Sequence, residues 1–158
     1  MTEPRTLGRD GIAALIPHSG SMCLLAALDS WDRQTILCHA TNHRDADHPL
    51  RTRSGLLASA AIEYAAQAMA LHGALIGQAD GAAATPGYLA SARGVQLHRL
   101  RLDDLPLPAH GTPDALRIEA TRSAGNAQQI LYTFRVSHAG APVADGRAAV
   151  VLNTGLAA

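Results

Sequence analysis

Glu63 and Gln67 are the residues of this sequence whose types and spacing best suit acid–base chemistry. They lie four positions apart, so a helix places both side chains on one face, about one turn from each other. Between Leu56 and Leu71 there is no proline, no glycine and only one formal charge, that of Glu63. A carboxyl group buried among apolar residues has a raised pKa, which suits a general acid near neutral pH. Periodicity alone leaves open the alternative that Glu63 faces solvent.

Histidines in two polar segments are the candidate partners for this carboxyl group. His18 lies in the turn-rich segment Pro-His-Ser-Gly-Ser-Met, directly ahead of an apolar run. His43 and His48 lie in residues 42–54, the stretch with the highest density of titratable groups in the chain. Histidine changes its charge near physiological pH, so each of the three is a candidate general base. A simple solvated loop position is the alternative for each.

The second polar segment also contains a mixed set of imidazole and carboxylate groups, His43, Asp45, Asp47 and His48. Such donors suit zinc or manganese, but their spacing matches no recurrent metal site. Acid–base chemistry beside the helix that carries Glu63 is the more economical interpretation. We therefore expect no metal and no cofactor in this protein.

The elements that would position these residues follow from the hydrophobic pattern. Residues 55–78 predict one long helix that is apolar on nearly every side and must be wrapped by other elements. A short helix is predicted over residues 9–16, ending before Pro17. Strands are predicted over residues 22–31, 34–41, 88–102, 115–123, 129–137 and 143–152. A lone buried helix among strands predicts an α+β hotdog fold, a curved antiparallel sheet wrapped round a central helix.

The length and composition of the chain indicate a single domain and argue against nucleic-acid binding and a membrane span. The 158 residues suit a single domain, residues 1–158, with a core from about residue 10 to residue 153. Acidic and basic residues balance at 13 each, with no basic stripe or aromatic platform, so we expect no nucleic-acid partner. Neither a signal peptide nor a membrane span is predicted, and we expect a cytoplasmic protein. Cys23 and Cys38 lack ligand spacing and are expected to be buried small hydrophobic residues.

Several segments, taken in order, resemble the hotdog-fold 3-hydroxyacyl-acyl carrier protein dehydratases. Ile-Glu-Tyr-Ala-Ala-Gln-Ala (62–68) resembles the Leu-Glu-x-x-Ala-Gln segment of their central helix. Pro-His-x-x-x-Met-x-Leu-Leu (17–25) resembles their N-terminal Pro-His segment, and Leu-Ala-Ser-Ala-Arg (89–93) resembles their Asn-Ala-Arg strand. More narrowly, these segments look like the dehydratase-like proteins encoded with aryl polyene pigment clusters, the ApeP type. The matches extend over residues 17–152.

This resemblance implies dehydration of a 3-hydroxyacyl thioester to the trans-2-enoyl thioester, in fatty acid or polyene-type pigment biosynthesis. In that reaction a histidine takes the C2 proton and the helix glutamate, here Glu63, protonates the departing C3 hydroxyl. His18 matches the Pro-His motif. His48 lies fifteen residues before Glu63, where these dehydratases place their histidine fourteen before, and His43 is a second candidate in the same loop.

The resemblance also implies how substrate and partners bind. Backbone N–H groups at the start of the helix would polarise the thioester carbonyl. The expected substrate-binding residues are Gly55, Leu56, Leu57, Gln67 and Arg93. The substrate would be carried on the phosphopantetheine of an acyl carrier protein, and the chain would form a homodimer or a heteromer with another hotdog chain. A hotdog thioesterase and a non-catalytic partner subunit of a second dehydratase are the alternatives.

Overall fold

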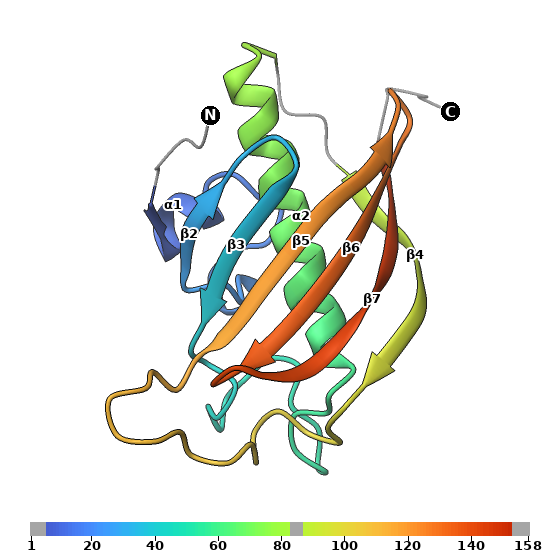
Figure 1. The fold of residues 1–158 in the computed structure, drawn as a ribbon. Helices are drawn as coiled ribbons and strands as arrows, with labels where there is room; N and C mark the ends of the chain where they lie inside the picture. The colour runs from blue at the N-terminus through green and yellow to red at the C-terminus, as the bar shows by residue number, and fades with distance from the viewer. Residues whose placement is uncertain (1–5, 83–86, 153–158) are drawn as a thin grey trace.

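The computed structural model describes residues 6–82 and 87–152, which form one sheet and one long helix. The elements in chain order are β1 (Leu7–Gly8), α1 (Arg9–Ala13), η1 (Gly20–Met22), β2 (Ala27–Trp31), β3 (Thr35–Ala40), α2 (Ala60–Ala79), β4 (Gly87–Leu97), β5 (Leu116–Gly125), β6 (Gln129–His138) and β7 (Ala141–Leu152). The seven strands are ordered β1-β2-β3-β5-β6-β7-β4, with every neighbouring pair antiparallel. The sheet curves round α2, as predicted (Figure 1).

The core lies between α2 and the inner face of the sheet. Alternate residues of β6 face inward, so Tyr132 and Phe134 are buried while the residues between them are exposed. On the helix, small residues such as Ala61, Ala65 and Ala68 are fully buried. Their short side chains let the helix backbone approach the sheet closely. The fold thus needs a helix rich in alanine, which is what the composition of this stretch supplies.

The helix begins at Ala60, five residues later than predicted. Residues before it form a turn in which Gly55 has φ +96° and exchanges backbone hydrogen bonds with Thr52. A Cβ at Gly55 would lie 2.6 Å from a carboxylate oxygen of Asp103, so a side chain does not fit there. The backbone of this turn also bonds to residues 100–102. Helix propensity is local, and these longer-range contacts override it.

Two predicted strands are shorter than expected because turns and longer-range hydrogen bonds replace one end of each. The first starts at Ala27 instead of residue 22, because Gly20–Met22 forms a 3₁₀ turn. The long strand β4 ends at Leu97 instead of residue 102, after a register shift between Arg93 and Gln96. Beyond it, the backbone N–H of Leu102 bonds to Leu56 and so holds the turn before the helix. The other four predicted strands lie close to their predicted positions, while β1 was not predicted and α1 ends at Ala13 instead of residue 16.

Two further findings concern features considered in the sequence. Cys23 and Cys38 are free and fully buried, which confirms their predicted packing role. Burial raises the pKa of the Cys38 thiol to about 12, so this cysteine stays protonated. Among the described residues, no helix combines the length and the apolar character needed to cross a membrane.

Candidate active site

The side chain of Glu63, in the first turn of α2, contacts the side chain of His18. Glu63 lies in the first turn of the helix, and His18 lies in the loop between α1 and η1. The Nε2 atom of His18 is 3.1 Å from Oε1 of Glu63. Their side chains are 27% and 34% exposed, so Glu63 is neither buried nor fully solvated. The imidazole and the carboxylate are therefore in contact with each other and partly open to solvent.

Gln67 holds these two residues in place. Its Nε2 donates to the carbonyl oxygen of Met22 at 2.7 Å and to Oε1 of Glu63 at 3.4 Å, while its Oε1 accepts the N–H of Leu24 at 2.8 Å. Its side chain is fully buried, so these bonds are shielded from competing water. Gln67 thereby ties the segment that follows His18 to the helix that carries Glu63.

The contact with Glu63 defines which nitrogen of His18 can act as a base. When Glu63 is ionised its carboxylate only accepts hydrogen bonds, so a neutral His18 then carries its proton on Nε2, towards Glu63. Nδ1 then holds a free lone pair. That atom is buried and has no hydrogen-bond partner within residues 6–82 and 87–152. His18 and Glu63 together form an oriented acid–base pair with one unoccupied proton-accepting position.

His48, the second candidate base, is engaged elsewhere. Its Nδ1 accepts the N–H of Leu50 at 3.1 Å, so its Nε2 carries a proton and donates to the hydroxyl of Tyr64 at 2.9 Å. Tyr64 in turn donates to Oδ1 of Asn42. Burial lowers the pKa of His48 and raises that of Tyr64, so both are neutral at pH 7. With both ring nitrogens occupied, His48 supports the loop before α2.

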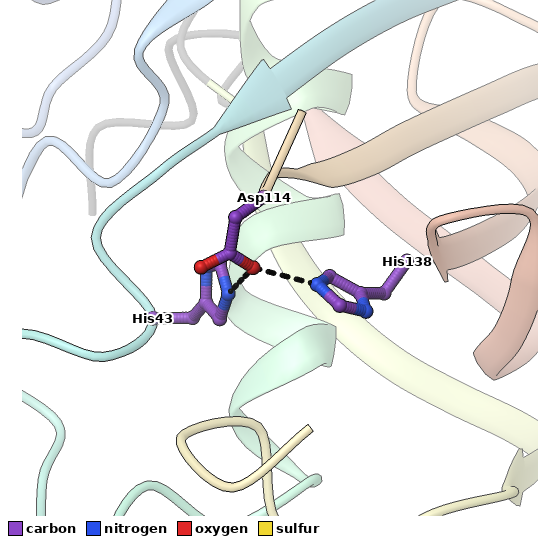
Figure 2. Close-up of side chains that lie close together, drawn as sticks. All are labelled: His43, Asp114 and His138. Atoms are coloured by element: carbon purple, nitrogen blue, oxygen red, sulfur yellow. Dashed lines mark hydrogen bonds and ion pairs between the residues drawn. The ribbon is translucent and has the colours of Figure 1, made fainter. Parts of the chain in front are cut away.

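His43, the third candidate, belongs to a separate cluster. It is fully buried, and its Nε2 lies 3.1 Å from Oδ1 of Asp114, which also lies 2.7 Å from Nε2 of His138 (Figure 2). Arg44 binds the same carboxyl group and holds the pKa of Asp114 well below its usual range. The structure thus brings His18, and neither His43 nor His48, into contact with Glu63.

The backbone donors expected near the thioester lie in the turn before α2. The N–H of Gly55 bonds to Thr52 at 3.0 Å, and the N–H of Leu56 bonds to Asp103 at 3.1 Å. In the described part of the chain, the N–H of Leu57 has no hydrogen bond, and its side chain is 39% exposed. Of the three expected donors, Leu57 is the one that can still polarise a carbonyl oxygen.

Arg93, the remaining expected binding residue, lies on the edge strand β4 opposite Arg147. It lines a groove of about 480 Å³ on the sheet together with Ser91, Gln129 and Arg147. Neither His18 nor Glu63 lines that groove. Nothing in the described residues places Arg93 beside the acid–base pair.

Asp103 positions the turn that carries Leu57, a role that sequence reasoning missed. Its side chain is only 6% exposed and binds Arg101 at 3.0 Å, the N–H of Leu56 at 3.1 Å and Arg51 at 3.3 Å. The hydrogen bond from Arg101 is the main reason why the pKa of Asp103 is lowered to about 2. Leu56 lies 47 positions from Asp103 in the chain, so no local pattern predicts the contact between them.

Replacing Asp103 by asparagine is expected to lower the free energy of unfolding by about 1–3 kcal/mol near pH 7. The folded carboxyl has a lower pKa than the unfolded one, so its stabilisation is present above about pH 4 and is lost as pH falls through about pH 2. Urea unfolding of wild type and Asp103→Asn near pH 7 and near pH 2 measures this. A difference that stays constant with pH would show that the carboxylate charge is not what stabilises the turn.

The fold and the site together define a hotdog protein with an acid–base pair on its central helix. The chain belongs to the ApeP-like family, whose sequence model, described as ApeP dehydratase, matches residues 11–157. No curated protein sequence matches the chain significantly.

Solved structures show the same fold. The dehydratase heterocomplex ApeI:P from Xenorhabdus doucetiae aligns with a TM-score of 0.79 and 21% identity, over 96% of this chain and 94% of that chain. A hypothetical thioesterase with coenzyme A from Streptococcus pneumoniae aligns at 0.53 and 9% identity, over 80% and 84%. The Escherichia coli PaaI protein, from the phenylacetic acid degradation operon, aligns at 0.55 and 12% identity, over 78% and 80%.

Proposed function

We propose that this protein dehydrates 3-hydroxyacyl thioesters, carried on the phosphopantetheine of an acyl carrier protein, to trans-2-enoyl thioesters. The observation that carries the proposal is the 3.1 Å contact between His18 and Glu63 on the central helix of an ApeP-like chain. Dehydration needs a base at C2 and an acid at the C3 hydroxyl, and an imidazole–carboxyl pair supplies both.

The proton balance follows from the orientation of His18. Its Nδ1, which is buried without substrate and must become accessible when the acyl chain binds, takes the C2 proton, and the electron pair of that C–H bond forms the C2–C3 double bond. The imidazolium passes its Nε2 proton to Glu63, which protonates the C3 hydroxyl as the C–O bond breaks and water leaves. One proton enters the pair and one leaves it, so the protein keeps its charge. The N–H of Leu57 would stabilise the charge that develops on the thioester oxygen.

Three exposed apolar side chains lie in segments that bond to α2 or to the turn before it, and they suit an acyl chain or a partner. Met22, whose backbone binds Gln67, is 40% exposed, and Leu57 is 39% exposed. Leu100, whose backbone binds Ala58 at the start of the helix, is 89% exposed. Large apolar residues grouped on a surface commonly mark binding sites.

We also propose that the chain has a partner at the edge of its sheet, and that this partner is another hotdog chain. Strand β4 is 11 residues long and, within residues 6–82 and 87–152, pairs only with β7, so its outer edge carries unpaired backbone groups there (Figure 1). Tyr88, Leu89 and Leu97 are exposed along it. The structural relative with a TM-score of 0.79 is itself described as a heterocomplex of dehydratases, which supports a heteromer.

Thioester hydrolysis is the second candidate function. Glu63 is 34% exposed and can activate a water molecule in place of protonating a hydroxyl group. The Streptococcus pneumoniae structure, described as a hypothetical thioesterase with coenzyme A, shows that the same fold occurs in proteins so described.

The test is to offer the purified chain 3-hydroxyacyl and enoyl thioesters of an acyl carrier protein, and to follow both product mass and free thiol. We expect loss of water from the first substrate and hydration of the second, with no thiol released. Cleavage of the thioester to a free acid and a free carrier thiol, with uptake of one water molecule, would support the thioesterase. Inactivity that is relieved only by adding a second hotdog dehydratase would make this chain a partner subunit and would overturn the assignment of activity to the chain alone.

A further inference from the structure

His43, Asp114 and His138 converge from three parts of the chain. His43 follows β3, Asp114 precedes β5, and His138 is the last residue of β6 (Figure 2). Oδ1 of Asp114 lies 3.1 Å from Nε2 of His43 and 2.7 Å from Nε2 of His138. One donor atom from each of the three residues lies within 4.8 Å of the others. None of these residues contacts His18 or Glu63 in the described structure.

We propose that these three side chains bind a zinc ion, through Nε2 of His43, Nε2 of His138 and Oδ1 of Asp114. Two imidazoles and one carboxylate are a donor set that zinc uses, with a water molecule as the fourth ligand. Tetrahedral bonds of about 2.0–2.2 Å place neighbouring ligand atoms about 3.4 Å apart. The two contacts in the cluster therefore need to lengthen by only about 0.3 and 0.7 Å to admit the ion.

The two histidines of the cluster are buried, while its aspartate is partly exposed and gives an ion access from solvent. His43 is fully buried and His138 is 4% exposed, while the side chain of Asp114 is 35% exposed. Burial of both rings shields the cluster from water that would compete for the ion. An ion would approach from the side of Asp114, where water can also complete its coordination.

Binding requires a change of tautomer that limits the affinity. Without metal, both rings carry the proton on Nε2 and donate to Asp114, so each proton must move to Nδ1 when zinc binds. Nδ1 of His43 is buried and has no hydrogen-bond partner among the described residues. Metal-binding histidines usually donate this second proton, and lack of a partner typically weakens binding by about 10- to 100-fold. We expect a Kd on the order of 1–10 µM, which is about 7–8 kcal/mol of binding free energy.

Arg44 orients the carboxylate of Asp114, and its positive charge weakens the binding of a cation there. Its Nε binds Oδ2 of Asp114 at 2.7 Å, which holds the carboxylate with Oδ1 towards the histidines. Its Nη2 binds Oδ1 at 3.1 Å and must release that atom when zinc binds. A neighbouring positive charge repels the cation, so Arg44→Gln should bind zinc about 3- to 10-fold more tightly than wild type.

The experiment is titration of the untagged, chelator-treated chain with Zn²⁺ near pH 7.5, by calorimetry and by the absorption of bound Co²⁺. We expect one ion per chain, tetrahedral cobalt bands, and at least about a 100-fold loss of affinity in His138→Gln and in Asp114→Asn. His39→Gln and His98→Gln are matched controls, because each removes a histidine from a two-residue pair with a surface aspartate. Circular dichroism of each variant checks that it is folded. If Asp114→Asn is unfolded, the affinity of folded His138→Gln alone decides the test.

Two results would overturn the proposal. The first is the absence of binding tighter than about 100 µM in wild type, which would leave the cluster as a hydrogen-bonded contact. The second is binding that survives in folded His138→Gln but falls in a control variant, which would place the ion on the surface. The readout is metal binding, so neither result depends on the proposed dehydration.

Discussion

Replacing Glu63 by glutamine is expected to lower the rate of enoyl thioester hydration by about 10²- to 10⁴-fold. Glutamine keeps the length of the side chain and can still accept a hydrogen bond from His18, but it cannot pass a proton to a departing hydroxyl. The Glu63 side chain is 34% exposed, so little buried structure is lost and stability should change by less than about 1 kcal/mol. Rate and melting temperature, measured on the same preparation, test both statements.

Glu119→Gln is the matched control for this variant. Glu119 is 40% exposed on β5 and its ion contact is with Arg117 on the same strand, at 3.8 Å. Its replacement removes the same charge without touching the helix or His18, so the rate should stay within about twofold of wild type. Wild-type turnover in Glu63→Gln would remove Glu63 from the mechanism.

Replacing His18 by glutamine is expected to reduce the rate by about 10²-fold or more, because no group is left to take the C2 proton. Glutamine can still donate from its amide to Glu63, so the loop should keep its place and the fold its stability. The double variant His18→Gln/Glu63→Gln should be little slower than the slower single variant, because two residues that act as one unit have non-additive effects. The rates of the four proteins, measured with one substrate, form the required cycle.

His48→Gln is the contrasting variant, with a different expected signature. It removes partners from Tyr64 and from the N–H of Leu50, so we expect about 1–3 kcal/mol of destabilisation. The fraction that remains folded should keep a rate near that of wild type.

His43→Gln completes the series of candidate bases. A rate loss in folded His48→Gln or His43→Gln that exceeds that of His18→Gln would transfer the role of base, and near-normal rates in all three would exclude histidine from the reaction.

Several features of the fold and the site can be predicted from the sequence because they depend on local periodicity. The alternation of residues 129–137 predicts a strand whose alternate residues are buried, and β6 covers this range. The four-residue spacing of Glu63 and Gln67 predicts a shared helix face, and their side chains are indeed in contact. Both patterns repeat within one or two turns of one element, so the rest of the chain is not needed to interpret them.

Other features depend on contacts between distant segments, which a single sequence does not reveal. The start of α2 is displaced from residue 55 to Ala60 because the preceding turn bonds to residues 100–103. His43 pairs with Asp114, which lies 71 positions away, whereas the sequence made His43 a candidate base beside Glu63. His48 is engaged by Tyr64, whose position on the helix showed no sign of a polar role.

The sequence by itself determined that a small-residue helix carries one carboxyl group and lies inside a curved sheet, because alanine content and strand alternation are local properties. Only the tertiary structure decided which histidine stands beside Glu63. Three histidines share similar loop surroundings in the sequence, and their roles differ through the partners that folding brings to them. His18 meets Glu63, His48 meets Tyr64, and His43 meets Asp114. Hydrogen bonds of this kind depend on three-dimensional distance, which residue type and spacing along the chain do not define.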